Sequence, residues 1–124
     1  MRGLIVACIA LMLAACASTS PPRNALNACS VFAEKKAWRE PVHDSQTKWG
    51  VPASVLMATI YHESSYRHDA RPPKRYLLGF IPWGRASSAY GYAQALDSTW
   101  EEYVTRQNRW FASRDNFSDA IDFV

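Results

Sequence analysis

One segment near the middle of the chain limits the possible folds more than any other. Gly50 is a natural helix stop, and Pro52 suits the first turn of the helix that follows it. The apolar residues of segment 52–65 recur at helical spacing, so the sequence predicts a helix over this range. No other part of the chain is as strongly patterned.

Glu63 lies in line with the apolar residues of this predicted helix. On a helical wheel with Leu56 at zero and about 100° per residue, Ile60 falls near 40° and Glu63 near 340°. We therefore expect Glu63 to be partly buried at the C-terminal end of the helix, where burial and the helix dipole both favour its neutral form. A carboxylic acid of this kind can donate its proton to a leaving oxygen.

Two other roles for this carboxylate are open from the residues alone. Glu63 can lie at the rim of the core, where its carboxylate either reaches water or pairs with Arg67 or Lys48. It can also belong to a zinc site, since His62 precedes it as in zinc-protease helices. That motif needs a second histidine at position 66, which is Tyr66, so no metal site is predicted.

The remaining segments predict further helices around one irregular stretch. A first helix is expected over 25–38 and a second from Pro41 to the stop at position 50. Residues 66–88 contain prolines, glycines and several basic residues, and we expect a long loop there. Ser98 and Glu101 have capping-box spacing, which predicts the start of another helix. No alternating strand pattern of five or more residues is found, so the predicted fold class is all-α with one long irregular loop.

The end of the chain resembles a helix that has only begun. Segment 116–124 starts with Asn116, a good N-cap residue, and shows no stop signal before Val124. We therefore expect the chain to be the N-terminal part of a longer domain.

The first residues read as an export signal. Arg2 supplies a positive charge, an apolar run of ten residues follows, and the run ends in Leu-Ala-Ala-Cys16. This ending resembles a bacterial lipobox, in which the cysteine carries lipid after cleavage, although a plain signal peptide that contains Cys16 is the alternative. We predict a lipoprotein signal peptide over 1–15, a tether over 16–24 and one domain over 25–124.

Charge and cysteine content restrict the partners of the exported chain. The formal net charge is +3 at pH 7, and loss of Arg2 with the signal lowers it to +2, a mild balance that suits an anionic polymer or surface. No basic run interleaved with aromatic residues suggests nucleic acid. Cys29 is unusual, because lone thiols in an oxidising compartment normally find partners. It is either buried and unpaired, or its partner lies outside this sequence.

Two motifs resemble a known enzyme family. Segment 49–64, which ends in His-Glu63-Ser64, resembles the catalytic helix of soluble lytic transglycosylase (SLT) domains. Segment 88–96, with Gly-Tyr-Ala-Gln at 91–94, resembles the Gly-Leu-Met-Gln motif of that family, and the Ser-Thr-Trp that starts at Ser98 resembles the capped helix after it. Together the matching blocks span roughly residues 42–104.

The resemblance implies a lysozyme-like fold and an enzyme that cleaves the MurNAc-GlcNAc bond of peptidoglycan glycan strands. It implies that Glu63 is the only catalytic acid and base, that the product carries a 1,6-anhydromuramyl end, and that no cofactor is needed. The residues that it implies for substrate binding lie on both motifs: Ser64, Tyr90, Gly91, Tyr92 and Gln94. With lipid on Cys16, and no Asp after it, the resemblance implies an outer-membrane lipoprotein that faces the periplasm.

The sequence departs from the family in three places. Tyr92 and Ala93 replace the usual Leu-Met, which changes the wall beside the bond that is cleaved. Residues 71–86 read as an insertion, whose Arg and Lys side chains either meet stem-peptide carboxylates or lie on a solvated loop. A tyrosine that the family carries in a later helix has no match here.

The number of carboxylates separates the possible activities. Most glycosidases need two, and the candidates for a second one are Asp69, Asp97 and Glu101. Capping explains the last two, and Asp69 has Arg67 and Arg71 nearby. A lytic transglycosylase needs only one carboxylate and is the preferred interpretation. A peptidoglycan-binding lipoprotein without turnover and a lysozyme-type hydrolase are the alternatives.

Overall fold

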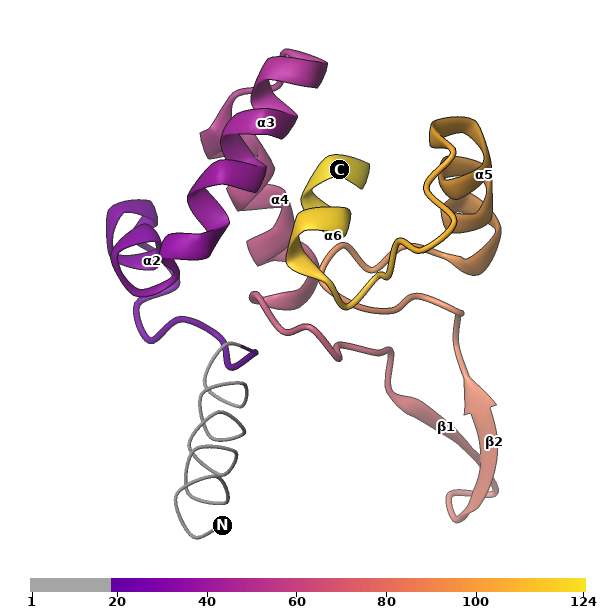
Figure 1. Cartoon of the computed structure of the whole chain (residues 1–124). Helices are drawn as coiled ribbons and strands as arrows, with labels where there is room; N and C mark the ends of the chain where they lie inside the picture. The colour runs from indigo at the N-terminus through magenta and orange to yellow at the C-terminus, as the bar shows by residue number, and fades with distance from the viewer. Residues whose placement is uncertain (1–18) are drawn as a thin grey trace, which may run out of the picture.

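The computed structural model describes residues 19–124, which form a mostly helical body with one protruding β-hairpin (Figure 1). The signal peptide, Cys16 and the start of the tether predicted from the sequence lie outside the described residues. Within 19–124 no helix is both long and apolar enough to cross a membrane. The helical elements are α2 (Ala28–Glu34), the 3-10 helix η1 (Lys36–Trp38), α3 (Arg39–Trp49), α4 (Ala53–Ser64), α5 (Asp97–Gln107) and α6 (Phe117–Phe123), and the strands are β1 (Lys74–Leu77) and β2 (Ile81–Arg85).

The helices that glycine, proline and cap residues mark in the sequence are confirmed. α3 ends at Gly50, which has a φ of 73°, and α4 begins directly after Pro52. α4 receives its cap from another element, because the backbone N–H of Ala53 donates to the side-chain oxygen of Gln46 in α3 at 2.8 Å. At α6 the Asn116 side chain accepts from the backbone of Asp119, as its N-cap position predicts.

Two local predictions need correction. The helix expected over 25–38 is split, because the backbone of Lys35 leaves the helical region (φ −105°, ψ 64°) between α2 and η1. This break lets Trp38 reach the core, where it is 7% exposed. The helix after residue 96 exists, but it starts at Asp97 with Leu96 as N-cap, and no side chain caps it.

The all-α prediction is wrong for the segment expected to be one irregular loop. β1 and β2 pair antiparallel around a turn whose central residues, Leu78 and Gly79, both have positive φ. Every strand residue is exposed, so no alternation of buried and exposed positions could mark the strands in the sequence. Leu-Gly is also not among the usual dipeptides of such a turn. The fold is therefore mostly helical with a two-stranded sheet.

The core lies where α3, α4 and α6 pack together. Its fully buried side chains come from elements at both ends of the described chain, and they include Val31, Leu56, Ile60 and Ile121. An aromatic group extends this core. The Trp38 and Phe117 rings stack with centroids 3.8 Å apart, and the Tyr92 ring meets both edge-on.

A second, polar contact centre joins α3, α5 and α6. Asp122 accepts hydrogen bonds from Lys48 at 3.0 Å, Trp49 at 3.1 Å, Tyr103 at 2.5 Å and Arg109 at 2.7 Å. Burial alone would raise the pKa of Asp122, but these hydrogen bonds outweigh it and hold the pKa below its ordinary value. The Asp122 carboxylate therefore connects three helices that lie far apart in the sequence.

Candidate active site

Glu63 lies on the last turn of α4 and is exposed, which corrects the expected partial burial. The buried residues of α4 are Leu56, Met57, Ile60 and Ser64, so the centre of the buried arc is nearer to 50° than to zero on the wheel used above. Glu63 falls just outside its edge. Among residues 19–124 the Glu63 carboxylate has no hydrogen-bond or ion-pair partner.

The two residues predicted as ion-pair partners of Glu63 form ion pairs with other residues. Lys48 pairs with Asp122 at 3.0 Å, and Arg67 pairs with Asp69 at 3.7 Å. The pairing with Arg67 or Lys48 therefore loses its candidates, whereas the exposure of Glu63 agrees with a rim residue that reaches water. The structure leaves this carboxylate free to meet a ligand from solution.

The chain reverses sharply after Glu63. Ser65 and Tyr66 have φ values of 52° and 61°, two consecutive non-glycine residues in the left-handed region. The reversal turns Tyr66 back under α4, where its ring is 2% exposed and its hydroxyl donates to the Met57 carbonyl at 3.1 Å. Burial raises the pKa of Tyr66. Strained backbone of this kind clusters at functional sites when the surrounding packing holds it in place.

The second motif forms a loop that is fastened to the segment leaving α4. We call residues 88–96 the motif loop. The backbone N–H of Gly91 donates to the Ala70 carbonyl at 3.0 Å. The Gln94 side-chain amide donates to the same carbonyl at 2.8 Å and to the Gly91 carbonyl at 2.9 Å. The motif loop is thus bonded to the segment that follows α4, at Ala70, seven residues after Glu63.

The other side of the motif loop is held by Arg114. Its guanidinium donates to the Ser88 and Ala95 carbonyls at 3.2 and 2.9 Å and pairs with Asp97 at 2.8 Å. Gly91 passes so close to this segment that an added Cβ would lie 2.0 Å from the Arg114 carbonyl oxygen. Only glycine fits at position 91, where φ is also +80°.

Tyr90 is the half-buried aromatic residue of the motif loop. The Arg71 guanidinium lies 4.1 Å from its ring centroid, and its hydroxyl donates to Asp115 at 3.1 Å. Burial, followed by the contact with Asp115, raises the pKa of Tyr90. Hydrogen bonds from the Ser113 and Tyr90 hydroxyls lower the pKa of Asp115.

The other predicted substrate-binding residues hold the site together from inside. Tyr92 is 3% exposed in the aromatic core, and burial raises its pKa to about 12. Ser64 is buried, and its hydroxyl donates to the Ile60 carbonyl at 3.1 Å. Tyr92 therefore packs in the core, Ser64 bonds within its own helix, and Gln94 closes the turn of the motif loop in place of the implied contacts with substrate.

The carboxylates considered as a second catalytic acid have other environments. Asp69 and Asp97 are ion-paired with Arg67 and Arg114, and Glu101 lies exposed on α5. The described part of the chain contains no cluster of three His, Cys, Asp or Glu side chains suited to a metal ion.

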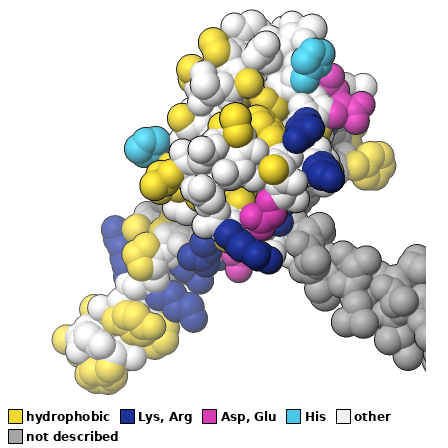
Figure 2. Space-filling view, turned by 90° about the vertical axis from the view of Figure 1, so that its left-hand side faces the viewer, with side chains coloured by type: hydrophobic (Ala, Val, Ile, Leu, Met, Phe, Trp, Pro, Cys, Tyr) yellow, Lys and Arg dark blue, Asp and Glu magenta, His cyan; other side chains and the backbone are white. Residues whose placement is uncertain are grey.

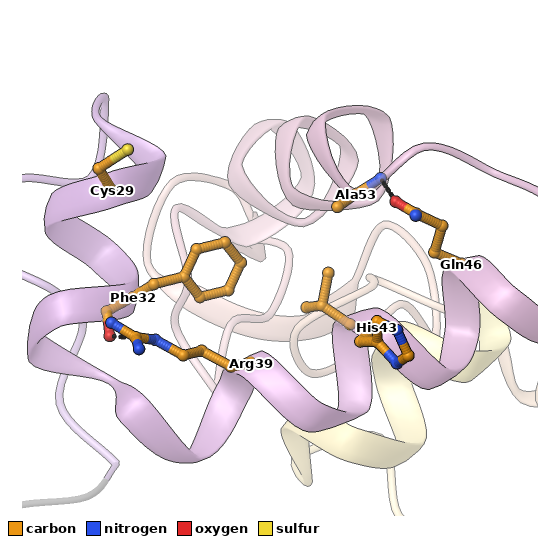
Figure 3. Close-up of a pocket in the computed structure, with 7 residues that line it drawn as sticks. Cys29, Phe32, Arg39, His43, Gln46 and Ala53 are labelled. Atoms are coloured by element: carbon orange, nitrogen blue, oxygen red, sulfur yellow. Dashed lines mark hydrogen bonds between the residues drawn. The ribbon is translucent and has the colours of Figure 1, made fainter.

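A cavity of about 370 Å³ lies elsewhere, between α2, α3 and the start of α4 (Figure 3). Its lining residues are Cys29, Phe32, Arg39, Val42, His43, Gln46 and Ala53. Glu63 lies ten residues beyond Ala53, or about 15 Å along the α4 axis, so this cavity is not the Glu63 site. Cys29 is free and exposed at its rim, which excludes the buried alternative for this thiol.

Sequence reasoning missed Arg114 and Asp115, which hold the motif loop and Tyr90. They lie beyond the two motifs, in a segment without periodic pattern, and no local signal marks them. Their role depends on the chain returning to the motif loop after α5, which only the three-dimensional structure shows.

Comparison with known proteins identifies a family. The family model described as "Transglycosylase SLT domain" covers residues 4–124. No curated protein and no solved structure matches the chain.

Proposed function

Because the chain belongs to the transglycosylase SLT domain family, we propose that it is a peptidoglycan lytic transglycosylase with Glu63 as its single catalytic acid and base. One observation carries the proposal. Glu63 stands exposed and unpaired at the end of α4, and the motif loop is bonded to Ala70 in the segment that leaves the same helix.

The proposed reaction needs only one carboxyl group. Glu63 first donates its proton to the oxygen of the MurNAc-GlcNAc bond, and the bond between that oxygen and the anomeric carbon breaks. The Glu63 carboxylate then accepts the proton of the MurNAc 6-hydroxyl, whose oxygen forms the new bond to the anomeric carbon. The proton count of Glu63 is restored, a 1,6-anhydro end is formed and no water is consumed.

An exposed acid suits a polymeric substrate. A glycan strand must reach Glu63 from solution, and a strand that lies over the carboxyl group removes water from it. A desolvated carboxyl group keeps its proton more readily. In this proposal the half-buried ring of Tyr90 borders the strand, while Ser64, Gly91, Tyr92 and Gln94 fix the positions of Glu63 and the motif loop.

The test is release of anhydromuropeptides from purified sacculi, followed by mass spectrometry. Glu63→Gln keeps the side-chain shape and removes the transferable proton, so turnover should fall by about 10²–10⁴-fold. Binding to sacculi should persist. Asp97→Asn is the matched control and should retain most of the activity, since the exposed Asp97 has no proposed chemical role and Arg114 keeps its bonds to the Ser88 and Ala95 carbonyls.

The products distinguish the alternatives. Reducing ends in place of anhydro ends, together with an inactive Asp97→Asn protein, would indicate a two-carboxylate hydrolase. Binding without any product would indicate a peptidoglycan-binding lipoprotein, a possibility that the Tyr-Ala at 92–93 favours because it changes the wall beside the bond. Unchanged release of anhydro ends by Glu63→Gln would refute the single-acid mechanism.

The location belongs to the same proposal. Acylation at Cys16 would attach the domain to the outer membrane on its periplasmic side, next to the peptidoglycan. The lipobox residues at 13–16 support this placement.

A further inference from the structure

The hairpin of β1 and β2 exposes more apolar side chains than any other described segment. Leu78, Phe80 and Trp83 are 76, 72 and 69% exposed. Tyr76, Leu77 and Ile81 are exposed as well. Exposed apolar groups of this size mark contact sites for proteins or membranes, and a two-stranded sheet with no cover on either face is only marginally stable in water.

The apolar and charged residues of the hairpin are separated along its length. The apolar residues occupy positions 76–83, at and near the turn, and the basic residues Arg71, Lys74, Arg75 and Arg85 lie where the hairpin joins the body. Segment 70–96 contains these four basic residues and no Asp or Glu, so its formal charge is +4. Figure 2 shows the apolar end of this arm and the Lys and Arg side chains between it and the body.

We propose that this hairpin inserts its turn into the surface of a bilayer that contains anionic lipids. A bilayer changes along its normal from charged headgroups to hydrocarbon. The hairpin changes in the same order, from basic residues where it joins the body to apolar residues at its turn. Tyr76 and Trp83 lie between the two zones, and Trp and Tyr favour the membrane interface. A protein groove or a glycan strand would instead need one apolar or aromatic face, whereas here both faces are exposed.

The pairing of the strands supports an anionic partner. Lys74 and Arg85 are direct cross-strand partners, and like charges in that position destabilise a strand pair. Negative headgroups around the base of the hairpin would remove this repulsion. The attraction between one basic residue and a nearby anionic surface changes the binding constant about fivefold.

The dimensions suit shallow insertion. Three residues from Tyr76 to the turn span about 10 Å, and interfacial segments bury their apolar side about 5–10 Å deep. The hairpin extends downward from the body in Figure 1. The inference does not depend on glycan cleavage.

The experiment measures quenching of tryptophan fluorescence by lipids that carry doxyl groups on their acyl chains. The full chain is bound to vesicles of phosphatidylethanolamine and phosphatidylglycerol. Trp83→Phe should abolish most of the quenching. Trp110→Phe is the matched control, because Trp110 is 63% exposed but lies outside the hairpin, and it should leave the quenching unchanged.

A series of charge substitutions tests the basic residues where the hairpin joins the body. Lys74→Gln and Arg75→Gln should each lower the ratio of inserted to free hairpin about fivefold, while Lys36→Gln, an exposed lysine on η1, should not. Vesicles of phosphatidylcholine alone should reproduce the loss.

Three results would overturn the proposal. The first is no lipid quenching of Trp83 at any phosphatidylglycerol content. The second is a change in Trp83 emission on addition of soluble glycan fragments without vesicles, which would assign the hairpin to the substrate site. The third is a change with protein concentration alone, which would assign it to a contact between two copies of the chain.

Discussion

At the scale of single residues, the candidate site is built on unusual backbone conformations. Ser65, Tyr66 and Gln94 have positive φ without being glycine, and each left-handed residue of this kind costs about 1–2 kcal/mol. Packing of Tyr66 and the hydrogen bonds of Gln94 offset that cost. The turn after Glu63 and the motif loop are therefore held in shapes that their own sequences do not prefer.

Gly91 offers a direct test of the close contact in the motif loop. Gly91→Ala should lower the free energy of unfolding by about 2–5 kcal/mol, from the left-handed backbone and from the overlap with the Arg114 carbonyl. Gly50→Ala has a similar φ but no atom within 4 Å, so it should cost only about 1–2 kcal/mol. Urea unfolding gives both values, and equal losses would show that the contact with Arg114 is unimportant.

At the scale of elements, the network around Asp122 predicts a dependence of stability on pH. The pKa of Asp122 lies below its ordinary value of about 3.9. A lowered pKa means that the folded state favours the charged form, so the stabilisation is present above the ordinary value and is lost as pH falls through the lowered pKa. The free energy of unfolding should therefore decrease from about pH 4 downward.

The variant Asp122→Asn should lower the free energy of unfolding by about 2–3 kcal/mol near pH 7, because the charged hydrogen bonds from Lys48 of α3, Tyr103 of α5 and Arg109 are lost. Its stability should also fall less steeply in acid, with the remaining slope due in part to Asp115. Asp44→Asn, at a side chain that is 71% exposed, should behave like the wild type. Parallel pH profiles for all three proteins would contradict the assignment.

The helices and strands also show which parts of the fold can be predicted from the sequence. Local signals sufficed for α3, α4 and the start of α6, because glycine, proline and asparagine act on the backbone beside them. The hairpin was missed because its strands bury neither face. The exposure of Glu63 was not predicted because this residue lies at the edge of the buried arc. At such an edge, the neighbours that pack against the helix determine whether a side chain is buried. The motif loop is bonded to Ala70 and Arg114 through contacts between residues far apart in the sequence. Such contacts produce no periodic pattern in the sequence.

At the scale of the whole molecule, anchoring can be tested separately from the hairpin. Cells grown with a palmitate analogue should label the wild-type protein, and Cys16→Ser should abolish the labelling. Cys29→Ser is the matched control and should remain labelled, since this exposed thiol has no proposed acyl group. Labelling that survives Cys16→Ser, or that depends on Cys29, would refute the lipobox assignment.

The packing of α3 against α6 also has a consequence for biogenesis. The Ser45 hydroxyl donates to the Ile121 carbonyl, Lys48 meets Asp122, and Trp38 stacks on Phe117, so each contact closes a loop of more than 70 residues. Contacts of such high sequence separation form slowly, because loop-closure entropy is lost before they are made. A nascent chain that has emerged only as far as α5 lacks three buried residues of this core, Phe117, Ala120 and Ile121. Translation ahead of α6 therefore leaves the core incomplete, and an incomplete core would suit the proposed export through a channel for unfolded chains.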